Sequence, residues 1–126
     1  MTKVHLDTCF LIRALVPGSD EDKALRKWLT KRIQIAISSV AWAEFLCGPL
    51  RPEDRAIARR LVGTPVAFIE SDADIAARFF NLGGRRRGSF VDCLIAAAAA
   101  RERAIFATCN PDDFSAFVED GLELAN

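Results

Sequence analysis

The chain has 126 residues, with 17 lysines and arginines against 17 acids, and 51% of its residues are hydrophobic. This is the size and composition of one compact domain, and it excludes an intrinsically disordered chain. The net charge of zero excludes the strongly basic composition that by itself indicates nucleic-acid binding, so a polyanion would have to be bound by a local patch. The longest uncharged run, 33–43, is well below the roughly 20 residues that cross a membrane, and the sequence after Met1 lacks the apolar region of a secretory signal. We therefore expect a cytoplasmic protein without a membrane span.

Apolar segments typical of short buried strands alternate along the chain with segments that have the spacing of amphipathic helices. In chain order, the first half predicts a strand over 3–6, an apolar stretch over 8–15 closed by Pro17-Gly18, a helix begun by Ser19, a strand over 33–37, a helix capped by Ser38 or Ser39 that runs towards Gly48, and a helix over 52–61. The second half predicts a strand over 66–69, a helix capped by Ser71 or Asp72 that ends near Gly83, a helix over 90–103, a strand over 104–107, a short helix opened by Asn110, and a small edge strand over 122–124.

This alternation predicts the α/β class. We expect a three-layer α/β/α domain over 1–126, with a central, mainly parallel sheet of about four or five strands and helices on both faces. In open sheets of this kind the working site forms outside the carboxyl ends of the strands. The residues that leave the expected strands there are Asp7, Ser38, Glu70 and the turn 108–113.

Four acids, Asp7, Glu44, Asp92 and Asp113, could meet at that edge of the sheet. Three of them also have a structural explanation as helix caps. Asp7 could cap the helix after the first strand, Asp92 fits an acidic capping box with the serine three residues before it, and Asp113 lies in the first turn of the helix opened by Asn110.

Glu44 is different, because its neighbours in the helix are apolar all round and predict a largely buried helix. A buried, ionised glutamate costs several kcal/mol unless a cation or several donors compensate it. The sequence leaves two compensations open: an ion pair with an arginine such as Arg13 or Arg59, or a metal ion shared with the other acids. Crowded carboxylates are relieved by a divalent ion, and oxygen-only ligands favour Mg²⁺ or Mn²⁺ over zinc. The corresponding chemistry is metal-assisted attack of water on a phosphodiester.

The four acids lie in segments that resemble the motifs of the PIN-domain ribonucleases, in particular the small stand-alone VapC-type toxins of prokaryotic toxin–antitoxin pairs. The segments are Val4-His5-Leu6-Asp7-Thr8-Cys9-Phe10-Leu11-Ile12, Ser38-Ser39-Val40-Ala41-Trp42-Ala43-Glu44-Phe45, Asp92-Cys93-Leu94-Ile95-Ala96-Ala97-Ala98-Ala99 and Thr108-Cys109-Asn110-Pro111-Asp112-Asp113-Phe114. The likeness covers essentially the whole chain, in order. It departs from the family at Cys9, where an asparagine is usual and whose thiol cannot reproduce the hydrogen bonds of an amide.

The resemblance implies a PIN-like fold, dependence on Mg²⁺ or Mn²⁺, endonucleolytic cleavage of RNA, a homodimer and inhibition by a cognate antitoxin. By position, it makes Asp7, Glu44, Asp92 and Asp113 the catalytic acids that hold metal. It favours Asp113 over the adjacent Asp112, because Asp113 directly precedes Phe114. The residues expected to support the site through a hydroxyl or an amide are Thr8, Thr108 and Asn110.

Two further groups of residues bear on function. The basic run Arg85-Arg86-Arg87 ends five residues before Asp92, so it either holds RNA phosphates near the acids or is a solvated loop. The cysteines Cys9, Cys47, Cys93 and Cys109 lie far apart in the sequence. We expect small buried thiols there rather than a metal or redox site.

Three other functions remain open. One is a PIN-like nuclease in RNA processing, which an antitoxin gene next to this one would argue against. A phospho-acceptor receiver domain fits poorly, because Asp7 stands alone after the first strand and no lysine follows Lys31. The last is a non-catalytic module that binds RNA or protein, which metal ions should not stabilise.

Overall fold

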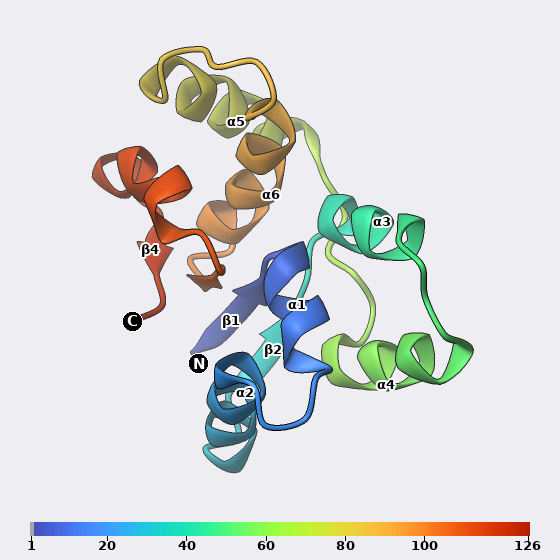
Figure 1. Ribbon diagram of the computed structural model, residues 1–126. Coiled ribbons are helices and arrows are strands. Elements are labelled where there is room, and N and C mark those ends of the chain that lie inside the picture. The colour runs from blue at the N-terminus through green and yellow to red at the C-terminus, as the bar shows by residue number, and fades with distance from the viewer. Residues whose placement is uncertain (1) are drawn as a thin grey trace.

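The computed structural model describes residues 2–126, so of the expected domain Met1 lies outside the described residues. Its centre is a parallel sheet in the order β2-β1-β3-β4, flanked by helices (Figure 1). In chain order the elements are β1 (Lys3–Leu6), α1 (Thr8–Ala14), α2 (Asp20–Thr30), β2 (Gln34–Ala36), α3 (Ser39–Cys47), α4 (Pro52–Val62), α5 (Glu70–Leu82), α6 (Phe90–Arg101), β3 (Ile105–Ala107), the 3₁₀ helix η1 (Pro111–Asp120) and β4 (Glu123–Leu124). The α/β class and the parallel sheet are as the sequence predicts.

Strand β1 lies inside the sheet, which explains why its apolar residues are buried. Val4 pairs with Ile35 of β2 on one side and with Ile105 of β3 on the other. The backbone N–H of Asp7 donates to the carbonyl of Ala107 at 2.8 Å, which extends the pairing with β3 one residue beyond the strand. Residues that leave β1 and β3 therefore start from neighbouring positions at one edge of the sheet.

Helix α6 is the best-buried helix of the fold. Its alanines 96–99 are fully buried, and their small side chains let α5, α3 and β3 approach it closely. Beside it, aromatic rings from α5 and η1 fill the core, with the centroids of Phe79 and Phe117 stacked 4.6 Å apart. Figure 1 shows α5 and α6 side by side at one end of the molecule. Asp92 lies in the first turn of α6, so this packing fixes the position of that residue in the fold.

The strand predicted over 66–69 is wrong, because only Val66 pairs, as an isolated parallel bridge to Ser38. The reason lies in the partners of the following residues. The N–H of Phe68 donates to the Ser39 hydroxyl, and the carbonyl of Ala67 accepts from the guanidinium of Arg101. Side chains thus satisfy the backbone groups that a ladder would need.

The start of α5 also differs from the prediction. Ile69 occupies the cap position, and Asp72, the third residue of the helix, accepts a hydrogen bond from the N–H of Ile69. Asp72 is completely buried and forms an ion pair with Arg101 at the end of α6. The ion pair keeps the Asp72 side chain in the interior. It also attaches the segment that precedes α5 to the end of α6.

The other helix starts agree better with the sequence. Ser19 and Ser38 cap α2 and α3, each accepting a hydrogen bond from a backbone N–H. No helix within residues 2–126 is long and apolar enough to cross a membrane.

Candidate active site

Asp7 is fixed by hydrogen bonds to both of its carboxylate oxygens. One oxygen accepts from the backbone N–H of Thr8 at 2.9 Å, so Asp7 does cap α1. The other accepts from the Thr108 hydroxyl at 2.7 Å and from the Cys9 thiol at 3.6 Å. The side chain is only 6% exposed. Asp7 can therefore cap α1 and still present a carboxylate oxygen at the edge of the sheet.

Glu44 is exposed, which corrects the expectation of a helix buried all round. Helix α3 buries only one face, formed by Ala41, Trp42 and Phe45, and its small residue Ala43 lies on the exposed side. The Oε1 atom of Glu44 accepts a hydrogen bond from the Thr8 hydroxyl at 2.8 Å. Within residues 2–126 no arginine pairs with it, so an ion pair with Arg13 or Arg59 is also wrong.

Asp92 shows most clearly that the four acids lie near one another. Burial, followed by the negative charges of Asp7, Glu44 and Asp113, raises the pKa of the Asp92 carboxyl to about 6. A capping role does not account for Asp92, because Ser89 makes no side-chain hydrogen bond to the start of α6. The carboxyl lies in the first turn of a helix, where the macrodipole favours a negative charge. The pKa is raised because burial and the repulsion from the other acids outweigh the stabilising effect of the helix macrodipole on the charged carboxylate.

The turn after β3 supplies the remaining groups of the site. Thr108 donates to Asp7 and accepts from the N–H of Asn110 at 3.1 Å, so its hydroxyl connects the turn to the acid. Asp113 lies at the start of η1, where its N–H donates to the Asn110 carbonyl at 3.0 Å and its side chain is exposed. Asn110 makes no side-chain cap of η1.

Cys9 connects Asp7 to the same turn, a role that sequence reasoning missed. Its sulfur accepts from the backbone N–H of Cys109 at 3.3 Å and from the side-chain amide of Asn110 at 3.9 Å. The thiol also donates to Asp7. The sequence contained one signal for this role. Cys9 lies close to Asp7, at the motif position where the PIN-domain ribonucleases that the chain resembles have an asparagine. Of the other cysteines, Cys93 is buried as expected, whereas Cys47 is exposed.

The four carboxylates offer only oxygen ligands, which fits a hard divalent cation such as Mg²⁺. They come from four different segments: the end of β1, α3, α6 and η1. In the described chain, 2–126, no three histidine, cysteine or acidic side chains are grouped tightly enough to hold a metal ion as they stand. Glu44 and Asp113 are both exposed, so their side chains have room to turn.

The basic run Arg85–Arg87 is exposed and lies close enough to act on the acids. Arg86 lowers the pKa of Asp92, although burial and the three acids outweigh it. Arg85 instead donates to the side chain of Asn81 at 2.7 Å and lies over the ring of Phe80 at 5.6 Å. The three arginines are thus not equivalent, a distinction that the sequence alone does not give.

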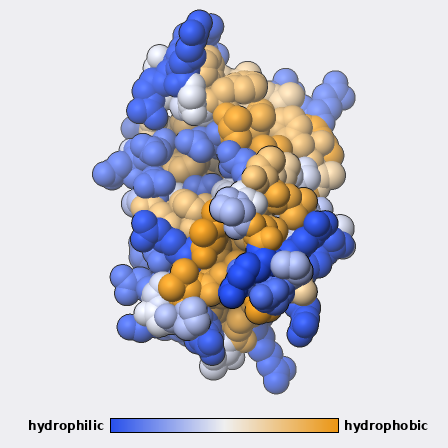
Figure 2. All heavy atoms as spheres, turned by 45° about the vertical axis from the view of Figure 1, so that its right-hand side comes forward, coloured by the Kyte–Doolittle hydropathy of each residue, from blue (hydrophilic) through white to orange (hydrophobic). Residues whose placement is uncertain are grey.

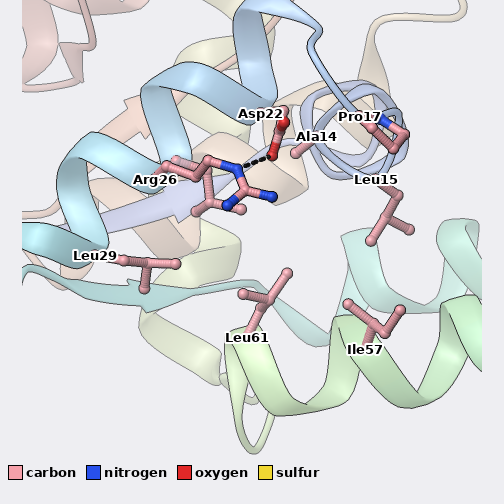
Figure 3. Close-up of a pocket in the computed structure, with 9 residues that line it drawn as sticks. Ala14, Leu15, Pro17, Asp22, Arg26, Leu29, Ile57 and Leu61 are labelled. Atoms are coloured by element: carbon pink, nitrogen blue, oxygen red, sulfur yellow. Dashed lines mark hydrogen bonds and ion pairs between the residues drawn. The ribbon is translucent and has the colours of Figure 1, made fainter.

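Two surface grooves lined mainly by apolar residues lie away from the four acids. One, of about 350 Å³, runs between α1, α2 and α4 and is lined by Leu15, Leu29, Ile57 and Leu61, with the Asp22–Arg26 ion pair at its side (Figure 3). The other, of about 400 Å³, adjoins α1 and the connection from α3 to α4 and is lined by Ile12, Val16, Phe45 and Leu50. Figure 2 shows hydrophobic side chains gathered over this side of the molecule. We call the two together the apolar grooves.

Several solved structures share this fold. FitAcB from Neisseria gonorrhoeae is 22% identical, with a TM-score of 0.73, and the match covers 98% of this chain and 96% of that one. VapBC2 from Rickettsia felis, bound to a DNA fragment from its promoter, is 20% identical, with a TM-score of 0.72 and coverage of 99% and 98%. A toxin–antitoxin complex from Klebsiella pneumoniae is 22% identical, with a TM-score of 0.72 and coverage of 90% and 91%. At these identities the likeness is one of fold.

The sequence comparisons give two results. No curated protein sequence matches the chain. The family model of the PIN domain matches residues 4–119, which contain most of β1, the four acids and the turn after β3. This chain therefore belongs to the PIN domain family.

Proposed function

We propose that this protein is a metal-dependent endoribonuclease that hydrolyses phosphodiester bonds of RNA and serves as the toxin of a toxin–antitoxin pair. One observation carries the catalytic part of the proposal. The charges of Asp7, Glu44 and Asp113 all act on Asp92, and none of the four carboxylates forms an ion pair within residues 2–126. A group of acids without counter-charge costs stability, and a bound cation relieves that cost.

Asp7, Glu44, Asp92 and Asp113 are the residues that would hold Mg²⁺ or Mn²⁺. A bound ion of this kind activates water and stabilises the charge on a transferring phosphate. The charge of Asp113 is one of those that raise the pKa of Asp92, and this supports Asp113 rather than Asp112 as the fourth acid.

The supporting residues orient these acids. Thr108 and Cys9 fix one oxygen of Asp7, and Thr8 donates to Glu44. Asn110 reaches the same network through its backbone N–H and its side-chain amide. Such outer contacts determine where a ligand oxygen points, and their loss commonly lowers metal affinity or activity by about 10- to 100-fold.

The basic run would hold the substrate. Arginine binds phosphate oxygens through a planar fork of donors, and Arg86 is close enough to the acids to act on Asp92. Arg87 has no ion-pair partner in the part of the chain that the structure describes. We assign phosphate binding mainly to these two arginines and a smaller share to Arg85, because Asn81 and Phe80 already engage its side chain.

The toxin role rests on the fold and on the apolar grooves. This chain has the same fold as the toxin–antitoxin complex from Klebsiella and as the FitAcB and VapBC2 structures. A cognate antitoxin would cover the apolar grooves, whose exposed residues include Val16 at 55% and Ile57 at 45%. We further propose that the protein forms a homodimer and acts in the cytoplasm, where its RNA substrate is found.

Cleavage of a mixed pool of structured and single-stranded RNA tests the catalytic proposal. The protein, purified free of partners, is incubated with Mg²⁺, with Mn²⁺ or with EDTA. We expect cutting with either metal and none with EDTA. The matched pair Asp113→Asn and Asp112→Asn should separate clearly, with cutting lost in the first and retained in the second.

The alternatives predict other results. A non-catalytic module would cut nothing and would not be stabilised by Mn²⁺ in a thermal melt. A nuclease of RNA processing would cut, but its expression in a bacterial host would leave growth unchanged. The toxin proposal predicts growth arrest that Asp92→Asn abolishes.

A further inference from the structure

Cys9 and Cys109 lie a hundred residues apart in the sequence, yet the fold places one against the other. Cys9 is in the first turn of α1, and Cys109 is in the turn after β3. The backbone N–H of Cys109 donates to the Cys9 sulfur at 3.3 Å, and the Cys9 thiol is also a hydrogen-bonding neighbour of the Cys109 side chain. Both thiols are free, and both residues are partly exposed. The two sulfurs are therefore neighbours that a small molecule in solution can reach.

The surroundings of Cys9 connect this pair to the candidate site. The Cys9 thiol donates to Asp7 at 3.6 Å, and its sulfur lies 3.8 Å from the Thr108 hydroxyl, which donates to the same Asp7 oxygen. The side-chain amide of Asn110 also donates to the sulfur, at 3.9 Å. A change in the chemistry of this one sulfur therefore acts directly on the hydrogen bonds that orient Asp7.

Two adjacent thiols can hold a soft metal ion or form a disulfide. A metal site needs further ligands, and within residues 2–126 no three histidine, cysteine or acidic side chains are grouped tightly enough. A disulfide needs no third group, only two Cα atoms within about 7 Å and sulfurs that approach to about 2 Å. The Cys109 nitrogen is 3.3 Å from the Cys9 sulfur, and the Cys109 sulfur is three bonds from that nitrogen. Rotation of the Cys109 side chain therefore brings one sulfur towards the other.

We propose that Cys9 and Cys109 form a reversible disulfide when the protein meets a peroxide, and that this bond switches off the candidate site. The inference rests on the proposed nuclease function, because RNA cleavage is what the bond suppresses. In the disulfide, Cys9 has no S–H to donate to Asp7, and the turn after β3 is tied covalently to α1. Asp7 then loses one of the contacts that orient its carboxylate. Transient, redox-sensing disulfides of this kind are the type that cytosolic proteins form.

The reaction has two balanced steps, with a peroxide as the oxidant. In the first, hydrogen peroxide oxidises the Cys9 thiol. An S–O bond forms, the O–O bond breaks, and water leaves with the thiol proton, so that Cys9 becomes a sulfenic acid. In the second, the Cys109 sulfur attacks the Cys9 sulfur, the S–O bond breaks, and the hydroxyl leaves as water with the Cys109 proton. The two thiols lose two electrons, and one peroxide becomes two molecules of water.

The surroundings of Cys109 assign it the second step. Burial, followed by the hydrogen bond and the charge of Cys9, raises the pKa of the Cys109 thiol to about 12. Cys109 is therefore a poor first nucleophile for a peroxide. A neutral sulfenic acid at Cys9 removes the Cys9 charge that contributes to this shift. By closing the disulfide, Cys109 then protects Cys9 from further, irreversible oxidation to a sulfinic acid.

Mass spectrometry detects the bond without requiring RNA cleavage. Trypsin places Cys9 in the peptide 4–13 and Cys109 in the peptide 104–126, and neither peptide holds another cysteine. The reduced full chain is treated with hydrogen peroxide, its remaining free thiols are alkylated, and it is digested without reductant. We expect 4–13 joined to 104–126 with the loss of two hydrogens, and dithiothreitol should separate them. On a denaturing gel without reductant, the linked protein should run as a single chain.

RNA cleavage by the same samples tests the effect on the site. The oxidised wild type should cut with Mg²⁺ at least about tenfold more slowly than the reduced protein, and dithiothreitol should restore the rate. Cys109→Ala keeps the backbone N–H that Cys9 accepts, so it should cut as the wild type does while reduced. After long exposure to peroxide, however, dithiothreitol should not restore it, because Cys9 proceeds to the sulfinic acid, seen as two oxygens added to 4–13. Cys47→Ala is the matched control, since its exposed thiol lies outside the pair, and it should behave as the wild type does throughout.

The outcomes separate this inference from the nuclease proposal. If peroxide leaves 4–13 and 104–126 unlinked in a wild type that cuts RNA when reduced, the disulfide is wrong and the nuclease stands. If the two peptides become linked and cleavage is unchanged, the bond is not a switch and the inference is overturned. If the peptides become linked but the reduced protein cuts no RNA with Mg²⁺ or Mn²⁺, the nuclease proposal fails while the disulfide itself is confirmed.

Discussion

A carboxylate lies at each end of α6: Asp92 is part of its first turn, and Asp72 of α5 lies beside its last turn. Comparing the two shows what distinguishes the candidate site in this fold. At the end of the helix, Arg101 forms an ion pair with Asp72, which is completely buried and also accepts a hydrogen bond from the N–H of Ile69. At its start, Asp92 is only partly buried, yet burial and three neighbouring acids raise its pKa to about 6. Burial alone therefore does not indicate function here. The difference is that the charge of Asp72 is compensated within the fold and that of Asp92 is not.

A third carboxylate supports this contrast. Burial raises the pKa of Glu102, but hydrogen bonds from His5 and Lys3 outweigh burial, so the pKa of Glu102 lies below its ordinary value. The ring of buried His5 lies 2.7 Å from the Glu102 carboxylate. His5 and Lys3 therefore form a network around Glu102 that lies outside the four acids.

The largest effect should come from Asp92→Asn. This change removes a charge at the uncompensated end of α6 and keeps the shape of the side chain. RNA cleavage with Mg²⁺ should fall by about 10³-fold or more, which corresponds to roughly 4 kcal/mol of transition-state stabilisation. The measurement is cleavage under single-turnover conditions, with circular dichroism to verify the fold. A folded variant that cuts at the wild-type rate would remove Asp92 from the site.

At the compensated end, Arg101→Leu should act on stability. It leaves Asp72 charged and buried without a partner, so the free energy of unfolding should fall by about 3–5 kcal/mol in urea titrations. Arg60→Leu, an exposed substitution on α4, is the control and should change it by less than about 0.5 kcal/mol. Equal effects of the two substitutions would show that Arg101 does not compensate Asp72.

Thr108→Val should affect both activity and stability. It removes the hydroxyl that donates to Asp7 at 2.7 Å while nearly preserving the side-chain volume. We expect cleavage to fall about 10- to 100-fold and stability to fall by about 1.5–3 kcal/mol. Thr30→Val is the matched control, since its hydroxyl donates to a backbone carbonyl in an exposed turn of α2. Wild-type cleavage by Thr108→Val would mean that Asp7 needs no help from this turn.

The smallest effect concerns pH and stability without metal. The folded pKa of Asp92, about 6, lies above its ordinary value of 3.8, so between these values the folded state binds more protons than the unfolded state. The contribution of Asp92 to stability is therefore present at low pH and is lost as the pH rises through about 6. After discounting for solvent screening, it should amount to about 1 kcal/mol. The difference in unfolding free energy between the wild type and Asp92→Asn isolates it, and a difference independent of pH from 4 to 7 would contradict it.

Much of the fold could be predicted because its signals are local. The apolar runs of β1, β2 and β3 and the caps Ser19 and Ser38 specify their elements within a few residues. The segment 66–69 has the same apolar signal but is not a strand, because its backbone partners are Ser39 and Arg101. Arg101 lies more than thirty residues away in the sequence, so no local pattern could reveal this pairing.

The candidate site divides in the same way. Positions at the carboxyl ends of strands indicated Asp7 and the turn after β3, and the structure brings both together with Asp92. The exposure of Glu44 could not be predicted, because it depends on which face of α3 is covered. Likewise, the separate environments of Arg85 and Arg86 depend on how the loop folds over Phe80.

The most direct test of the central claim is a ¹³C NMR titration of the Asp92 side-chain carboxyl, first in EDTA and then with Mg²⁺. If the four acids form an uncompensated group that a divalent ion neutralises, Asp92 should titrate near pH 6 in EDTA, and Mg²⁺ should lower its midpoint by at least about one pH unit. A midpoint near the ordinary value of 3.8 in EDTA, unchanged by Mg²⁺, would contradict the account.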